Sequence, residues 1–239
     1  MAHVLITGGS RGIGAACVRA FAAAGDRVAF IYRASAKAAE DIAKGTGAYP
    51  IRADLSDPAE AARAAEEAIS ALGGVDVLVN NAGVAQIKLF TDLTDGDWRR
   101  VLSTDLDGAF YLTRAVARDM IARHSGRIVN IGSMWGKVGA SCEVHYSAAK
   151  AGLRGMTMAL AKELGPSGIT VNCVEPGVIE TEMNAALDER TRADLADATP
   201  LCRLGTPAEV AAAVRFFASD AAAFITGQCL GVDGGYAIG

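Results

Sequence analysis

Short apolar runs alternate with longer segments of helical spacing along this chain. The apolar runs are rich in Val, Ile and Leu and end in glycine, asparagine or proline, which is typical of buried strands. The segments between them repeat small and apolar residues every three or four positions, which predicts helices. We find no linker and no repeat, so the pattern predicts one α/β domain over residues 1–239, a doubly wound parallel sheet of about seven strands with helices on both faces. The predicted strands are 3–7, 28–32, 48–55, 75–79, 126–133, 169–174 and one within 227–235.

Several helices carry their own start signals. Asp57 precedes Pro58, with Glu60 in the capping-box place, and Thr206 precedes Pro207 in the same way, with Glu209 three positions after the threonine. Long helices are predicted over 97–123 and from residue 143 to the proline at 166. The charged, alanine-rich stretch 182–203 is predicted to be helical in part and to act as a lid.

A glycine-rich turn lies between the first predicted strand and the first predicted helix. Glycine lets the backbone approach a diphosphate closely, and the following helix N-terminus offers unpaired N–H groups. A plain tight turn is the alternative, but the strand–turn–helix context favours a dinucleotide site. The candidate cofactor residues of this turn are Gly8, Ser10, Arg11, Gly12, Ile13 and Gly14.

The end of the second predicted strand selects the dinucleotide. An acidic residue there would bind the ribose 2′-hydroxyl of NAD, whereas arginine accommodates the 2′-phosphate of NADP. The chain has Tyr32-Arg33 at this place and Arg11 in the glycine turn. These arginines could also be ordinary surface charges, but we favour NADP(H) as the cofactor.

Polar and small residues follow other predicted strands. Asp54 and Leu55 end the third strand, and Asn81-Ala82-Gly83 follows the fourth. Because ligands bind at the carboxyl ends of strands in such sheets, we expect these residues beside the cofactor. Turn chemistry alone is the other interpretation of the Asn-Ala-Gly sequence.

Tyr146 and Lys150 are four residues apart on a predicted helix, so their side chains share a face. A phenol ordinarily titrates near pH 10, and a nearby ammonium favours the phenolate. The hydroxyl of Ser133, at the end of a neighbouring strand, could hold a substrate oxygen beside this phenol. Such a group could interconvert a ketone and an alcohol by proton transfer, although the pair alone could be an ordinary surface pair.

The overall composition narrows the possible partners. Hydrophobic residues make up 51% and charged residues 21%, with a net charge of −4 and no block of Lys or Arg, so we expect neither nucleic acid nor a membrane as partner. We expect no secretory leader, and no apolar run is long enough to span a bilayer. The cysteines are odd in number and scattered, which predicts a cytoplasmic protein without disulfides or a metal site. They are Cys17, Cys142, Cys173, Cys202 and Cys229.

Taken together, these motifs resemble the short-chain dehydrogenase/reductase family over essentially the whole chain. The resemblance implies a Rossmann-like NAD(P)-binding domain, with Tyr146 as general acid/base, Lys150 binding the nicotinamide ribose and lowering the pKa of Tyr146, and Ser133 orienting the carbonyl. It also implies a homotetramer. The residues that match are Thr7-Gly8-x-x-x-Gly12-Ile13-Gly14, Asn80-Asn81-Ala82-Gly83, Ser133, Tyr146-x-x-x-Lys150 and Pro176-Gly177-x-x-x-Thr181, and by resemblance Asn81, Ala82, Gly83, Pro176, Gly177, Val178 and Thr181 would contact the cofactor.

One position departs from the family pattern. Family members place an asparagine on the long central helix, where it holds a water that links the lysine to bulk solvent. Here Asp105 stands at that position. A carboxylate accepts hydrogen bonds but cannot donate them as an amide does, and near Lys150 it favours the ammonium form. We expect Asp105 to occupy the proton-relay site in altered form.

The substrate stays open between alternatives. The sequence is most similar to the 3-oxoacyl-[acyl-carrier-protein] reductase branch, which implies a thioester ketone carried on an acidic protein, and Arg123 is the candidate docking cation. Trp135 and Glu143 border the predicted pocket. The sequence Ser141-Cys142-Glu143-Val144 before Tyr146 is similar to that of reductases that act on a 5-aminopentanone group of translation elongation factor P. Glu143 could pair with the ammonium of that substrate. Trp135 could instead be core, and Glu143 a solvated charge. A sugar or steroid ketone, or a non-catalytic NADP sensor, are further alternatives.

Overall fold

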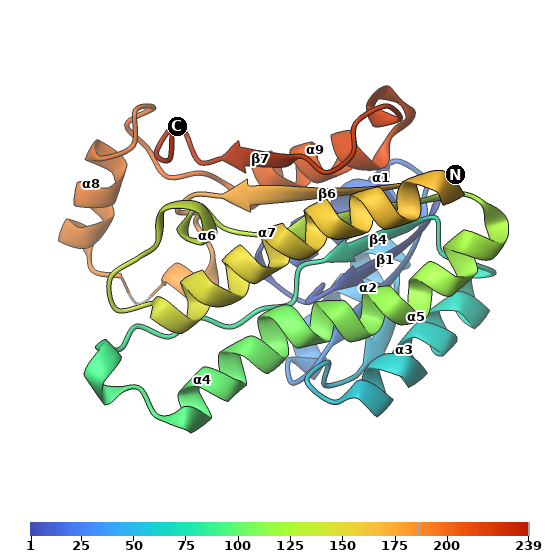
Figure 1. The fold of residues 1–239 in the computed structure, drawn as a ribbon, viewed down its shortest axis with the longest axis horizontal. Coiled ribbons are helices and arrows are strands. Elements are labelled where there is room, and N and C mark those ends of the chain that lie inside the picture. The colour runs from blue at the N-terminus through green and yellow to red at the C-terminus, as the bar shows by residue number, and fades with distance from the viewer. Residues whose placement is uncertain (186, 239) are drawn as a thin grey trace.

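A computed structural model describes residues 1–185 and 187–238 of the protein. Its centre is a seven-stranded sheet in the order β3-β2-β1-β4-β5-β6-β7 (Figure 1), and each neighbouring pair of strands is parallel. The order reverses between β1 and β4, which creates the crevice where ligands bind in sheets of this kind. The strands are β1 His3–Thr7, β2 Arg27–Tyr32, β3 Tyr49–Arg52, β4 Val77–Asn80, β5 Gly126–Ile131, β6 Ile169–Pro176 and β7 Cys229–Val232.

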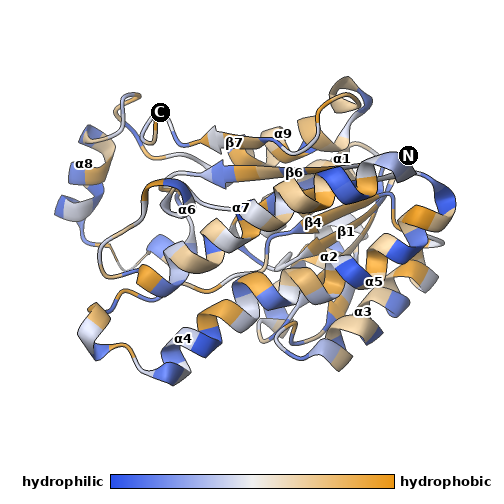
Figure 2. Ribbon diagram, in the orientation of Figure 1, coloured by the Kyte–Doolittle hydropathy of each residue, from blue (hydrophilic) through white to orange (hydrophobic). Residues whose placement is uncertain are grey.

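Helices cover both faces of the sheet and bury a core on each. One core joins the sheet to α1, α2 and α9, and the other joins it to α3, α5 and α7. Figure 2 shows hydrophobic colours along most of the central strands, while hydrophobic and hydrophilic colours alternate along the helices. The bounds are α1 Gly12–Ala23, α2 Ala36–Thr46, α3 Pro58–Leu72, α5 Gly108–Arg123, α7 Val144–Leu164 and α9 Pro207–Ala218.

The strand sequences follow from this double burial. In β1, Val4 and Ile6 point into one core and Leu5 into the other, and all three are fully buried. Such strands read as continuous apolar runs because neither face meets water. The predicted fold class, a doubly wound parallel sheet with helices on both faces, is confirmed. Among the helices of the described residues, none combines the length and apolarity needed to cross a bilayer.

The remaining elements are the segment before α5, the predicted lid and several short turns. The predicted long helix 97–123 is composed of α4 Asp95–Leu102, a π-helical turn Ser103–Asp107 and α5. The predicted lid contains a 3₁₀ turn, Glu182–Asn184, and α8 Glu189–Asp197. The other short elements are α6 Trp135–Val138 and the 3₁₀ turns Phe90–Asp92, Gly165–Ser167 and Asp220–Ala222.

Two local predictions need correction. The carboxylate of Glu60 does not close a capping box on Asp57; it accepts the backbone N–H of Asp54 at 2.8 Å, while the Asp57 side chain caps α3 alone. The strand predicted over 169–174 is longer than expected, because β6 continues to Pro176 through its pairing with β7. The capping box of Thr206 and Glu209 at α9 is confirmed.

Candidate active site

The backbone of the glycine turn, residues 8–14, packs too closely for side chains at several positions. Gly8 has a φ of +66° and Gly12 a φ of +53°, in the left-handed region that favours glycine. A Cβ on Gly14 would lie 2.2 Å from the carbonyl oxygen of Gly8 and 2.5 Å from Asn81 Nδ2. The turn therefore has no room for a side chain at residue 14.

Side chains on two strands hold this turn in place. Thr7 Oγ1 accepts the backbone N–H groups of Asn81 and Ala82, each at 2.8 Å, and Asn81 Nδ2 donates to the Thr7 carbonyl at 2.9 Å. The bonds tie the end of β1 to the end of β4, at the point where the strand order reverses. The sequence prediction placed Asn81, Ala82 and Gly83 here but assigned no role to Thr7, whose position at the end of the first strand was the available signal.

The N-terminus of α1 fits a diphosphate. The helix begins at Gly12, its N-cap Arg11 makes no side-chain cap bond, and its first turn contains no acidic residue. Its first amide groups are therefore free of side-chain acceptors, and its dipole favours an anion. Ser10, Arg11 and Ile13 lie on this rim, with Arg11 exposed.

Arg33 and Asp54, both predicted to contact the cofactor, lie side by side at the ends of β2 and β3. Arg33 Nη1 is 3.6 Å from Asp54 Oδ2, and the Arg33 side chain is half exposed. Tyr32 is partly buried against the core on the α1 side, and the buried Leu55 lies against Gly108 at the start of α5. This surface offers a cation next to the turn that would hold the phosphates.

Tyr146 and Lys150 share one face of α7, as their spacing predicted. Lys150 Nζ lies 5.5 Å from the centre of the Tyr146 ring and donates to the Ile131 carbonyl at 3.2 Å. Ser133 is buried just beyond β5, where its hydroxyl accepts the Trp135 N–H at 3.1 Å and lies close enough to the Tyr146 phenol to lower the pKa of Tyr146. The structure thus brings Ser133, Tyr146 and Lys150 together.

Asp105 joins this group as an ion-pair partner of the lysine. Its Oδ2 lies 3.2 Å from Lys150 Nζ, its Oδ1 accepts the N–H of Val84 at 2.8 Å, and both charged side chains are almost fully buried. The π-helical turn between α4 and α5 places Asp105 here, and a Cβ on Gly83 would lie 2.7 Å from its Oδ2. Such π-helical turns are frequent at functional sites.

The net effect on the phenol differs from the expectation. Burial raises the pKa of Tyr146, and the charge of Asp105 adds to this, while Lys150 and Ser133 act in the opposite direction without outweighing them. Lys150 does lower the pKa, as predicted, but the total is upward because burial and the carboxylate of Asp105 have the larger effect. Burial works against the ammonium of Lys150, yet Asp105 and Tyr146 together raise the pKa of Lys150, so it stays charged.

The loop after β6 closes the cofactor side. A Cβ on Gly177 would lie 2.7 Å from the Cα of Asp233, and a Cβ on Gly12 would lie 3.4 Å from Thr181 Cγ2. Thr181 therefore packs on the glycine turn, while Pro176 ends β6 and Gly177 follows it. The candidate cofactor residues thus come mainly from the carboxyl ends of β1, β2, β3, β4 and β6.

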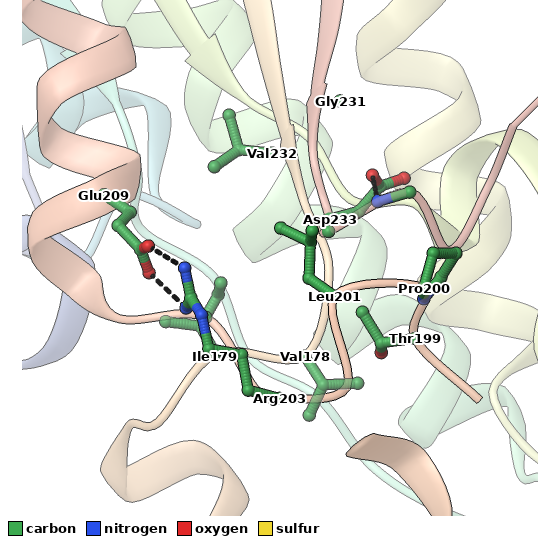
Figure 3. Close-up of a pocket in the computed structure, with 13 residues that line it drawn as sticks. Val178, Ile179, Thr199, Pro200, Leu201, Arg203, Glu209, Gly231, Val232 and Asp233 are labelled. Carbon is green, nitrogen blue, oxygen red and sulfur yellow. Dashed lines mark hydrogen bonds and ion pairs between the residues drawn. The ribbon is translucent and has the colours of Figure 1, made fainter. Parts of the chain in front are cut away.

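A cleft of about 510 Å³ lies behind this loop, between it and the chain after β7 (Figure 3). Among the predicted site residues only Val178 lines it, so it does not coincide with the group around Tyr146. On its wall Arg203 binds both carboxylate oxygens of Glu209, the residue that caps α9.

The two predicted pocket residues flank the start of α7. Trp135 is partly exposed and packs edge-on against Tyr236, with ring centres 5.5 Å apart, so it is not core. Glu143 precedes α7, and burial raises the pKa of its carboxyl group. Within the described residues no hydrogen bond or ion pair engages this carboxyl group.

Arg123, the candidate docking cation, does not lie beside Tyr146. Its guanidinium binds Asp76, Asp119 and the Val75 carbonyl just before β4. These residues lie at the amino ends of the strands, opposite to Tyr146. The arginine stabilises the junction of α5 with the sheet.

His145 is a neighbour that the sequence analysis did not single out. It is fully buried next to Tyr146, and neither ring nitrogen has a hydrogen-bond partner within the described residues. Burial and the charge of Arg100 lower the pKa of His145. Its position between two glycine- and alanine-rich segments gave no signal of burial.

Comparisons with known proteins agree with this geometry. Residues 8–237 match the family model described as enoyl-(acyl carrier protein) reductase. The chain is 42% identical over 236 residues to a 3-oxoacyl-[acyl-carrier-protein] reductase of Aquifex aeolicus, covering 97% of this chain and 95% of the relative, and 42% identical over 233 residues to that of Escherichia coli, with the same coverage. It is 43% identical over 232 residues to an acetoacetyl-CoA reductase of Shinella zoogloeoides, covering 97% and 96%.

A solved structure shares the fold along its full length. A putative gluconate dehydrogenase from Agrobacterium tumefaciens superposes with a TM-score of 0.93 at 34% identity, over 99% of this chain and 96% of that one. With the glycine turn, the buried serine and the tyrosine–lysine pair in place, the chain belongs to the short-chain dehydrogenase/reductase family, oxidoreductases that act on CH–OH groups with a nicotinamide cofactor.

Proposed function

We propose that this protein is an NADPH-dependent reductase of 3-oxoacyl thioesters, with the acyl chain carried on an acyl carrier protein. The observation that carries the proposal is the convergence of the Ser133 hydroxyl, the Tyr146 phenol and the Lys150 ammonium at the carboxyl ends of the strands. The near-full-length identity to 3-oxoacyl reductases supports a ketone rather than an enoyl substrate.

The choice of NADPH rests on Arg33. Its half-exposed guanidinium is held beside Asp54 at the carboxyl ends of β2 and β3, and Arg11 adds a second exposed cation on the glycine turn. A guanidinium binds a phosphate through charge-assisted hydrogen bonds, whereas the 2′-hydroxyl of NAD would leave this cation unpaired.

Each residue has a role in the proton transfer. The bound nicotinamide would supply the hydride. Ser133 and Tyr146 would both bind the ketone oxygen, and Tyr146 would donate its proton there as the alcohol forms. Lys150 would hold the ribose and stabilise the phenolate that remains, and Asp105 would keep the lysine charged.

The pKa of Tyr146 favours the reductive direction. Burial and Asp105 raise that pKa from its ordinary value, which favours the protonated phenol. A protonated phenol is the form that donates to a ketone, whereas alcohol oxidation needs the phenolate. We therefore propose ketone reduction as the working direction.

The test is NADPH oxidation with a panel of acetoacetyl and crotonyl thioesters, with Tyr146→Phe as the variant. We expect turnover on acetoacetyl thioesters, none on crotonyl thioesters, and a loss of about 10²–10⁴-fold in Tyr146→Phe with NADPH binding retained. Equal turnover in the variant would refute the role of the phenol. Turnover on crotonyl thioesters alone would refute the ketone assignment.

A second candidate substrate is a ketone that carries an ammonium group. The half-buried Glu143 lies within electrostatic range of Tyr146. The ammonium group of a cationic substrate could form an ion pair with the Glu143 carboxylate. Glu143→Gln should then raise KM for an amino-ketone and leave KM for acetoacetyl thioesters unchanged.

We further propose a single NAD(P)-binding domain that assembles as a homotetramer in the cytoplasm. The exposed apolar side chains of α5 and α7, Phe110, Ile121 and Met158, support association through these helices. Light scattering on the purified protein would measure the mass, and a monomer at micromolar concentration would refute the tetramer.

A further inference from the structure

Two cysteines face each other on the last two strands of the sheet. Cys173 of β6 is the register partner of Cys229 of β7, and Figure 1 shows these strands side by side. Paired residues on neighbouring strands lie about 4.7–4.9 Å apart. This spacing falls within the Cα separations of about 4.4–6.8 Å at which disulfides form.

The two sulfur atoms belong to a tight buried cluster. Cys173 Sγ, Cys229 Sγ and a carboxylate oxygen of Glu175 all lie within 4.8 Å of one another. Both oxygens of Glu175 are already bound by Arg154 of α7, at 2.9 and 2.7 Å. Because the arginine occupies the carboxylate, the cluster favours chemistry between the thiols over metal binding.

The two thiols differ in exposure and in acidity. Cys173 is fully buried, and the neighbouring Cys229 thiol together with burial raises the pKa of Cys173 well above its ordinary value. Cys229 is partly exposed; the neighbouring Cys173 thiol lowers the pKa of Cys229, and Arg154 acts in the same direction against burial and Glu175. Since the thiolate is the nucleophile, Cys229 is the reactive member.

We propose that Cys173 and Cys229 form a peroxide-sensitive dithiol that closes to a disulfide, with Cys229 as the attacking thiol and Cys173 as the resolving thiol. The Cys229 thiolate attacks one oxygen of hydrogen peroxide, the O–O bond breaks, and sulfenic acid and hydroxide result; the hydroxide takes up the proton lost by Cys229. The Cys173 sulfur then attacks the Cys229 sulfur, and the S–O bond breaks. The hydroxyl leaves as water with the Cys173 proton, so that two thiols and one peroxide give one disulfide and two waters.

The location connects this dithiol to the candidate active site. A Cβ on Gly132 would lie 2.8 Å from Cys173 Sγ, and Gly132 directly precedes Ser133. The Gly132 N–H donates to the Val174 carbonyl at 2.8 Å, so β6 and the serine segment move together. A disulfide that changes the spacing of β6 and β7 would therefore shift the segment that holds the Ser133 hydroxyl.

The test is cysteine mapping of the full chain carrying Cys142→Ser and Cys202→Ser, which removes the other accessible thiols. Trypsin cuts after Lys162, Arg190 and Arg215, so Cys173 and Cys229 fall in separate peptides. After peroxide treatment and alkylation, we expect a linked pair of these peptides that dithiothreitol separates. Cys17, buried with its pKa raised to about 12, should remain a thiol and serves as the internal control.

Two variants distinguish the roles of the thiols. In Cys173→Ser, dimedone should trap a sulfenic acid on Cys229; in Cys229→Ser, Cys173 should stay reduced at the same peroxide concentration. Circular dichroism checks that both variants fold. Oxidation of Cys173 in the Cys229→Ser variant would overturn the assigned roles. Failure to form the link while Cys173 and Cys229 react no faster than Cys17 would overturn the dithiol.

Discussion

The carboxylate of Asp105 and the ammonium of Lys150 form an ion pair, with 3.2 Å between Oδ2 and Nζ, buried beside the phenol of Tyr146. The aspartate raises the pKa of Tyr146, while the lysine lowers it. The relay position therefore carries a charge that opposes the lysine's effect on the phenol.

Replacing Asp105 by asparagine should lower the pKa of Tyr146, because a negative charge near the phenol is removed. The pH at which alcohol oxidation reaches half its maximum should move down, and ketone reduction should lose activity at lower pH than in the parent. The measurement is the pH profile of kcat in both directions. Asp107→Asn, on the same π-helical turn, is the control and should leave the profile in place. A shift to higher pH in Asp105→Asn would contradict the electrostatic role.

A methyl group at Gly14 should disrupt the dinucleotide site. The added Cβ would lie 2.2 Å from the Gly8 carbonyl oxygen, so the turn must move. We expect Gly14→Ala to weaken dinucleotide binding at least tenfold, or about 1.4 kcal/mol. Gly45→Ala is the matched control, since nothing lies within 4 Å of its Cβ, and it should stabilise α2 by up to about 1 kcal/mol. Fluorescence titration and thermal unfolding give both quantities; equal binding in the two variants would argue against a diphosphate at the turn.

Arg33→Ala should weaken NADPH selectively. A hydrogen bond to a charged group contributes about 1.5–3 kcal/mol, so KM for NADPH should rise roughly 10- to 100-fold while KM for NADH stays the same. Arg19→Ala, an exposed arginine of α1, should change neither. An equal rise for both cofactors would mean that Arg33 supports the fold and not the 2′-phosphate.

The contact between Arg203 and Glu209 should appear in the acid stability of the protein. Arg203 and the cap bonds of Thr206 lower the pKa of Glu209 from 4.5 to about 2. The unfolded chain therefore binds more protons between these values, so this contribution is complete above 4.5 and is lost as pH falls toward 2. Glu209→Gln removes the titrating group, so its unfolding free energy should depend less on pH over this range. Identical acid dependence of the two proteins in urea unfolding would contradict the shift.

Much of the candidate site is predictable because its signals are local. A strand, a glycine turn and a helix follow one another within residues 3–24, and the four-residue spacing of Tyr146 and Lys150 places them on one face of any helix. The polar residues after other strands are also predictable, because parallel strands end at a common edge.

Other features depend on segments that the sequence does not bring together. The long helical pattern gives no sign of the π-helical turn that carries Asp105 to Lys150, nor that Arg123 would find Asp76 at the far end of the strands. Cys173 and Cys229 lie opposite each other because of the register between two strands that are more than fifty residues apart in the sequence.

The sequence by itself therefore determined the fold class, the dinucleotide turn and the tyrosine–lysine pair, since each follows from the period of a helix or strand. Only the tertiary structure decided the balance of charges around Tyr146. That balance depends on burial and on distances between α7, the π-helical turn and β5, which packing sets. The direction of the Tyr146 pKa, and with it the preference for donating a proton, belongs to the folded protein alone.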